Sequence, residues 1–246
     1  MELTRSTALV TGGAVRIGRA IVAALAARGC RVVIHYDRSA AAAESLVAAL
    51  RCEGHDAWAV QADLQGEADC AALVEQARAA AGRLDILVNN AAIFVKGTLA
   101  AADEAQWMAV LRPNLLVPIL LTRAFAAGTR QGQVINLLDR RISGHEPGCI
   151  PYVLSKQALA EFTQAAALEL APGIRVNAVA PGPVLAPPGK GAQYLQDHAG
   201  RIPLGRRIAP ADVAKAVVAL LELDNVTGQI VYVDGGQGLL GTLVAP

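Results

Sequence analysis

The stretch Thr11-Gly12-Gly13-Ala14-Val15-Arg16-Ile17-Gly18 decides the fold of this chain of 246 residues. It follows the apolar run Ala8-Leu9-Val10, which predicts a buried strand, and it opens a segment in which apolar residues recur at helical spacing. A glycine-rich turn between a strand and a helix brings backbone N–H groups close to a pyrophosphate at the helix N-terminus. The stretch therefore predicts a dinucleotide site, with Arg16 standing where such turns usually keep a glycine.

Strands and helices alternate along the rest of the chain. Apolar, β-branched runs predict six further strands, at 31–36, 57–61, 84–88, 133–138, 174–180 and 229–233. Alanine- and leucine-rich segments predict helices at 39–51, 67–81, 103–127, 151–170 and 211–221, with Pro113 and Pro118 as kinks or breaks. This order predicts an α/β chain: one Rossmann-fold domain over 1–246, a doubly wound seven-stranded parallel sheet with helices on both faces. The segment at about 183–205 is expected to cover the substrate.

Composition excludes several classes of protein. Hydrophobic residues make up 54% of the chain and charged residues 17%, as in globular proteins. A net charge of +1 without a basic block argues against nucleic acid or a membrane as partner. The apolar runs are shorter than a membrane span, and the first predicted strand leaves no room for a signal peptide. We therefore expect a cytoplasmic protein. The four cysteines and the residues His145 and His198 lack ligand spacing, so no metal is expected.

The end of the second predicted strand bears on the choice of dinucleotide. An acidic residue at its last position would accept hydrogen bonds from the ribose of NAD, but Tyr36 stands there. Arg38 and the hydroxyl of Ser39, which is also expected to cap the next helix, favour the 2′-phosphate of NADPH. Asp37 supports the opposite assignment, to a ribose, and Arg38 is equally compatible with a solvated surface cation. We expect NADPH.

Tyr152 and Lys156 lie four residues apart in a predicted helix and therefore share one face. A lysine ammonium near a phenol is expected to lower the pKa of the phenol. The tyrosine then delivers a proton while hydride goes to the adjacent carbon of a substrate. Taken alone, the pair is equally typical of an ordinary amphipathic helix.

Over essentially its whole length the chain resembles the short-chain dehydrogenase/reductase family. The resemblance lies in residues that occur in family order and spacing: Thr11-Gly12-Gly13…Gly18, Asp63, Asn89-Asn90-Ala91, Asn114, Tyr152-x-x-x-Lys156, Pro181-Gly182 and Val233-Asp234-Gly235-Gly236. It implies a nicotinamide cofactor along Gly12, Arg16, Ile17 and Gly18, with Asp63 and Leu64 near the adenine and Asn90 and Ala91 near a ribose. It further implies that Tyr152 and Lys156 contact the nicotinamide half, together with Pro181 and Gly182, and that Asn114 holds a water of a proton relay. The resemblance also implies a homotetramer, which the family usually forms through the helices at 103–127 and 151–170 and the C-terminal region.

Two departures narrow the resemblance to the pteridine reductases. The family usually places a serine thirteen residues before the tyrosine, where this chain has Asp139; the other departure is Arg16. The pteridine reductases are similar in both, in His35-Tyr36-Asp37-Arg38-Ser39 and in Phe94. The resemblance implies that Arg16, Phe94, Asp139 and Tyr152 bind a pterin, with Asp139, Tyr152, Lys156 and Asn114 as the catalytic set. Ala92 differs from the serine that is common there.

Other interpretations remain open at this point. Arg16 is compatible with a role confined to the pyrophosphate, Phe94 with ordinary packing, and Asp139 with an ion pair to Arg140 or Arg141. We expect an NADPH-dependent reductase of a pterin or dihydrofolate-like small molecule. The alternatives are a carbonyl or 3-oxoacyl thioester reductase of the same family, and a protein that binds NADPH without catalysis.

Overall fold

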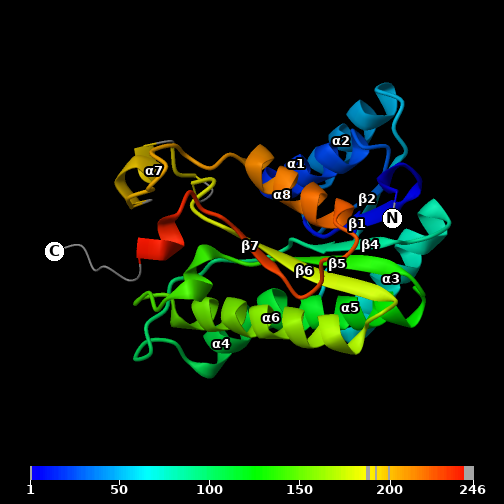
Figure 1. Cartoon of the computed structure of the whole chain (residues 1–246). Coiled ribbons are helices and arrows are strands. Elements are labelled where there is room, and N and C mark those ends of the chain that lie inside the picture. The colour runs from blue at the N-terminus through cyan, green and yellow to red at the C-terminus, as the bar shows by residue number, and fades with distance from the viewer. Residues whose placement is uncertain (1, 187–188, 192, 199, 241–246) are drawn as a thin grey trace.

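The computed structural model describes residues 2–186, 189–191, 193–198 and 200–240. Within these residues seven strands form one sheet in the order β3-β2-β1-β4-β5-β6-β7, and all neighbouring strands run parallel (Figure 1). The strands are β1 (Thr7–Val10), β2 (Arg31–Tyr36), β3 (Ala57–Gln61), β4 (Ile86–Asn89), β5 (Gly132–Leu137), β6 (Ile174–Pro181) and β7 (Ile230–Val233). The predicted α/β fold with a seven-stranded parallel sheet is confirmed.

Helices cover both faces of the sheet, as predicted (Figure 1). One face carries α1 (Arg16–Ala26), α2 (Ala40–Cys52) and α8 (Pro210–Glu222); the other carries α3 (Glu67–Ala81), α5 (Val117–Ala127) and α6 (Ile150–Glu169). Strand β1 shows why Ala8, Leu9 and Val10 form a continuous apolar run. Val10 packs into the core beneath α1 and α8, whereas its neighbour Leu9 packs into the core beneath α3 and α5.

The helical stretch predicted over 103–127 has three parts. These are α4 (Glu104–Leu111), a π-helical turn η2 (Arg112–Leu116) and α5. Pro113 lies in the π-helical turn, and Pro118 is the second residue of α5, which continues directly from that turn. By length and composition alone Glu104–Ala127 would qualify as a membrane span, contrary to the sequence expectation. However, α5 buries Leu121 and Phe125 in the core, as a core helix does.

The structure differs from the sequence prediction in several short segments. The 3-10 helices η1 (Leu3–Arg5), η3 (Arg140–Ser143) and η4 (Gln237–Leu240) were not expected, because three or four residues are too few to show a helical period. The short helix α7 (Gln193–His198) lies within the segment expected to cover the substrate. Residues 187–188, 192 and 199 of that segment lie outside the described residues. Pro181, assigned to a loop from the sequence, is the last residue of β6, where it pairs with Val233.

The order of the strands brings the predicted motifs together. The chain runs outward from β1 through β2 to β3 and then returns to β4 on the other side of β1. Ligands of such sheets bind beyond the carboxyl ends of the strands where the order reverses. The glycine turn follows β1 and Asn90 follows β4, so both lie at this switch point.

Candidate active site

The glycine turn joins β1 to α1 and lies against Asn90. Gly12 has a φ of +60°, which glycine adopts without strain. The side-chain amide of Asn90 donates to the carbonyl oxygens of Thr11 (2.8 Å) and Gly12 (3.2 Å). A Cβ on Gly18 would collide with the carbonyl oxygen of Gly12 and lie 2.7 Å from Nδ2 of Asn90. This close approach of helix and turn is the arrangement that a bound pyrophosphate requires, so the residues present fit a dinucleotide.

His35 supports the turn from β2, and sequence reasoning assigned it no role. Its Nδ1 accepts a hydrogen bond from the Gly12 N–H (3.2 Å), and its Nε2 lies 3.0 Å from the carbonyl oxygen of Ala62. The neutral imidazole with its proton on Nε2 satisfies both partners. Burial lowers the pKa of His35, although the Ala62 carbonyl and the charge of Asp37 act against this shift. The sequence offered one signal for this role, because His35 is a polar residue in an otherwise apolar stretch and stands one position before the end of β2.

This geometry predicts an acid-sensitive turn. Because the pKa of His35 is lower in the folded than in the unfolded chain, its contribution to stability is complete above the ordinary value of 6.5 and is lost as the pH falls below it. Protonation also removes the acceptor for the Gly12 N–H. We expect NADPH affinity and the urea midpoint to fall on acidification in the wild type and to fall less in His35→Gln, which keeps an acceptor but does not titrate. Parallel acid profiles for the two proteins would contradict this role.

The residues expected to select NADPH lie beyond the ends of β2 and β3. The Arg38 side chain is 93% exposed, and its Nε donates to Oδ2 of Asp37 at 2.9 Å. Ser39 occupies the N-cap position of α2, but its hydroxyl makes no capping hydrogen bond, so the predicted capping role is wrong. The physical reason is its backbone, which lacks the extended conformation of an N-cap (φ −94°, ψ 47°). Tyr36 ends β2, and Asp63 follows β3 beside it.

The other predicted cofactor residues surround the same edge of the sheet. Ile17 packs against the core under α1, and Leu64 packs against the core under α3. The backbone N–H of Ala91 donates to the Thr11 hydroxyl (3.0 Å). The N–H of Gly182, directly after β6, donates to the carbonyl of Val233 (3.0 Å).

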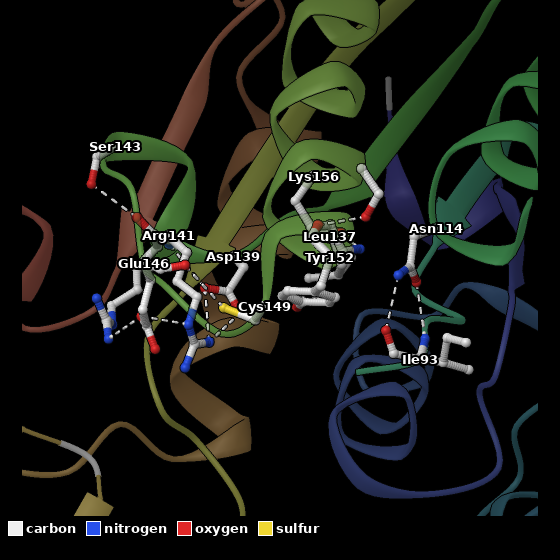
Figure 2. Close-up of polar contacts among 12 residues, drawn as sticks. Ile93, Asn114, Leu137, Asp139, Arg141, Ser143, Glu146, Cys149, Tyr152 and Lys156 are labelled. Carbon is white, nitrogen blue, oxygen red and sulfur yellow. Dashed lines mark hydrogen bonds and ion pairs between the residues drawn. The ribbon is translucent and has the colours of Figure 1, made fainter. Parts of the chain in front are cut away.

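Tyr152 and Lys156 lie on the first turns of α6 and are both buried (Figure 2). The Tyr152 hydroxyl donates to Oδ2 of Asp139 at 2.9 Å. Asp139 directly precedes η3, two residues beyond the end of β5, so the strand sets its position. The structure thus joins two residues that the sequence separates by thirteen positions. It also confirms the open alternative that Asp139 pairs with Arg141, at 3.1 Å.

The prediction that the Lys156 ammonium lowers the pKa of the Tyr152 phenol is wrong. The ammonium of Lys156 donates to the carbonyl of Leu137 (2.7 Å), and burial lowers the pKa of Lys156 to about 8. Burial and the adjacent carboxylate of Asp139 raise the pKa of Tyr152 well above its usual value. The cation that lowers it is Arg141. The phenol therefore carries its proton at neutral pH, as a proton donor must.

Asn114 lies across from the tyrosine, in the π-helical turn η2 (Figure 2). Its side chain is fully buried and makes two hydrogen bonds to the backbone of Ile93, one to the N–H and one to the carbonyl, each 2.9 Å. These bonds hold the segment that carries the next residue, Phe94. A π-helical turn inside a long helix frequently marks a functional position.

Direct contacts link three of the four predicted substrate residues. The ring of Phe94 meets the ring of Tyr152 edge-on, with centroids 4.8 Å apart, and remains 44% exposed. Phe94, Tyr152 and Asp139 therefore form one group. Arg16 stands at the start of α1, with a φ of +56°, and its Nη2 donates to the carbonyls of Leu185 (3.3 Å) and Ala186 (3.0 Å). Arg16 thus links the glycine turn to the segment expected to cover the substrate.

Comparisons with known proteins cover nearly the whole chain. A family model described as enoyl-(acyl carrier protein) reductase matches residues 13–237. Pteridine reductase 1 of Leishmania tarentolae is 34% identical, with 96% of this chain and 97% of that protein aligned. The 3-oxoacyl-[acyl-carrier-protein] reductase of Staphylococcus aureus is 35% identical, with 96% and 99% aligned.

A solved structure is similar throughout. The alternative dihydrofolate reductase 1 of Brucella canis, complexed with NADP, superposes with a TM-score of 0.92 at 36% identity, covering 97% of this chain and 96% of that one. The dinucleotide predicted from the glycine turn agrees with that complex. By their names, these relatives act either on pteridines and dihydrofolate or on 3-oxoacyl thioesters, and their identities to this chain are similar. Similarity therefore shows the family, and the choice of substrate has to be argued from the site. The chain belongs to the short-chain dehydrogenase/reductase family of oxidoreductases.

Proposed function

We propose that this chain is an NADPH-dependent reductase of a pterin or dihydrofolate-like substrate. The observation that carries the proposal is the hydrogen bond between the Tyr152 hydroxyl and Oδ2 of Asp139 (2.9 Å). A carboxylate at this position accepts hydrogen bonds and, when ionised, donates none. It suits a substrate that offers N–H groups beside a C=N bond better than it suits a simple ketone.

The cofactor residues support the choice of NADPH. Gly12, Gly18 and the N-terminus of α1 would hold the pyrophosphate. Arg38 and the Ser39 hydroxyl, which makes no capping hydrogen bond, would hold the 2′-phosphate. The set of proposed contacts is completed by Arg16, Ile17, Tyr36, Asp63, Leu64, Asn90, Ala91, Tyr152, Lys156, Pro181 and Gly182. When bound, the reduced nicotinamide supplies the hydride for the substrate carbon.

The chain's own residues would bind and protonate the substrate. The half-exposed ring of Phe94 would stack on a planar heterocycle. Asp139 accepts from the N–H groups of that ring, and Arg16 donates to its lactam oxygen. Tyr152 then transfers its hydroxyl proton to the substrate nitrogen, so that with the hydride on carbon the C=N double bond becomes a C–N single bond with new C–H and N–H bonds. Lys156 and the buried Asn114 would return a proton to the tyrosine through water.

Turnover of candidate substrates tests this function. NADPH oxidation is measured with dihydrobiopterin and dihydrofolate, and in parallel with ketones and a 3-oxoacyl thioester. The proposal expects the two reduced heterocycles to be turned over fastest. The second candidate, a carbonyl reductase, is favoured by the 35% identity to a 3-oxoacyl thioester reductase and would be established by turnover of the carbonyl compounds alone. NADPH binding without turnover of any compound would instead indicate a non-catalytic role.

A homotetramer is part of the proposal. The side chains of Met108, Leu116, Leu154 and Leu168, on α4, η2 and α6, are exposed in the single chain. Apolar side chains on neighbouring helices suit contact between subunits. Light scattering coupled to size-exclusion chromatography measures the mass directly, and the mass of a single chain would contradict the assignment.

A further inference from the structure

Arg141 contacts several residues of the candidate site, whereas the sequence suggested only an ion pair with Asp139. It is the second residue of η3, two positions after Asp139. Its backbone N–H donates to Oδ1 of Asp139 (2.9 Å), and its Nη1 lies 3.3 Å from Oδ1 and 3.1 Å from Oδ2. Because Oδ2 also accepts from the Tyr152 hydroxyl, one carboxylate lies between a guanidinium and a phenol.

Two further contacts hold the guanidinium. Its Cζ lies 5.2 Å from the ring centroid of Phe94, within range of a cation–π interaction. Its Nε donates to Oε2 of Glu146 at 2.7 Å. Figure 2 shows Arg141 between Asp139 and Glu146, beside Tyr152. The guanidinium is thus held by two carboxylates and by the ring that we assign to the substrate.

The charges at this cluster show what Arg141 does electrostatically. Burial disfavours the charged form of Arg141, but Asp139 and Glu146 outweigh this effect, so the pKa of Arg141 lies above its usual value and the charge is permanent. Asp139 raises the pKa of Tyr152, and Arg141 lowers it. Lys156, the cation expected to act on the phenol, donates instead to the Leu137 carbonyl.

We propose that Arg141 is a positioning residue for proton transfer, which holds Asp139 against the Tyr152 hydroxyl and offsets the charge of that carboxylate beside the phenol. The inference rests on the proposed function only in that Tyr152 donates the proton to the substrate. The same transfer serves a C=N bond and a ketone. Arg141 therefore acts through Asp139 and Tyr152 whichever substrate the enzyme reduces.

Arg141→Ala and Arg141→Lys test the inference, and Arg140→Ala is the matched control. Arg140 is the neighbouring residue, and the structure gives its guanidinium an ion pair to Glu146 at 3.5 Å and no contact with Asp139. Circular dichroism and NADPH affinity verify that each variant folds. The kcat is then measured against pH, with dihydrobiopterin and a 3-oxoacyl thioester as parallel substrates, in water and in deuterium oxide.

Arg141→Ala leaves the Asp139 charge uncompensated, so Tyr152 becomes a weaker acid. We expect kcat at neutral pH to fall about threefold to tenfold, because the rate of general acid catalysis follows acid strength with a Brønsted slope below one. The alkaline limb of the kcat profile moves to higher pH, and the solvent isotope effect rises because proton transfer becomes slower. Arg141→Lys, or guanidinium ions added to Arg141→Ala, restores part of the loss.

If Arg141 had only a structural role, Arg141→Ala would change the stability or the substrate KM. Its pH profile of kcat and its solvent isotope effect would then match those of Arg140→Ala, and that result would overturn the inference. If Arg141→Ala does not fold, Arg141→Lys provides the test, because lysine keeps the charge but loses the planar guanidinium that contacts both carboxylate oxygens of Asp139. A pH profile of kcat identical to that of Arg140→Ala would again count against the role of Arg141. Turnover of the thioester alone would refute the pterin proposal, while the same variants would still test Arg141 on the thioester.

Discussion

Tyr152→Phe should lower kcat for NADPH-dependent reduction by about 10²–10⁴-fold, the usual contribution of a positioned general acid. The substitution removes only the hydroxyl that donates to Asp139 and that carries the transferable proton at neutral pH. The ring stays, and with it the edge-on contact to Phe94. Steady-state rates and NADPH affinity measured by fluorescence check the prediction together.

The affinity for NADPH should change little in Tyr152→Phe, because the glycine turn and its supports are untouched. Asp139→Asn is an informative partner variant, since the amide keeps the size of the side chain and removes its charge. Unaltered reduction in Tyr152→Phe would show that the proton comes from another group, and the proposed mechanism would be wrong.

Gly18→Ala should weaken NADPH binding by roughly 10–100-fold, as expected for 1–3 kcal/mol of forced overpacking. The added methyl group meets the carbonyl oxygen of Gly12, a backbone atom, and lies 2.7 Å from the amide nitrogen of Asn90. Neither partner can move without opening the turn. Isothermal titration of NADPH measures the affinity, and urea unfolding measures the stability.

Gly66→Ala is the matched control for this prediction. Gly66 directly precedes α3, its backbone is extended, and a Cβ there meets no atom within 4 Å. We expect near wild-type affinity and stability from this variant. An affinity in Gly18→Ala equal to that of Gly66→Ala would mean that the packing of α1 on the turn does not shape the cofactor site.

Much of the fold was predictable because its signals are local. Strands buried on both faces appear as continuous apolar runs, and the turn chemistry of Gly12 and Gly18 marks the first strand–helix junction. The sheet order then brings Asn90 onto that turn without further information from the sequence. The predicted outer helix ends differ from the observed ones by at most one residue, which is within the usual uncertainty of such boundaries.

The site was less predictable because its decisive contacts depend on direction as well as spacing. The four-residue separation of Tyr152 and Lys156 places them on one helix face, yet Lys156 reaches the Leu137 carbonyl, and Arg141 is the cation that acts on the phenol. Arg141 belongs to η3, which is too short to show a period. Similarly, no local pattern could tell that Arg16 bonds to the carbonyls of Leu185 and Ala186.

The most direct test of the account is the ratio of kcat/KM for dihydrobiopterin to kcat/KM for a 3-oxoacyl thioester, measured in the wild type and in Asp139→Ser. We attribute the preference for a C=N substrate to the Asp139 carboxylate, at a position where the family usually has a hydroxyl that donates to a carbonyl oxygen. We expect a ratio well above one in the wild type and a ratio shifted toward the thioester, by about tenfold or more, in Asp139→Ser. A wild-type enzyme that reduces only the thioester, with a ratio unchanged by the substitution, would contradict this attribution.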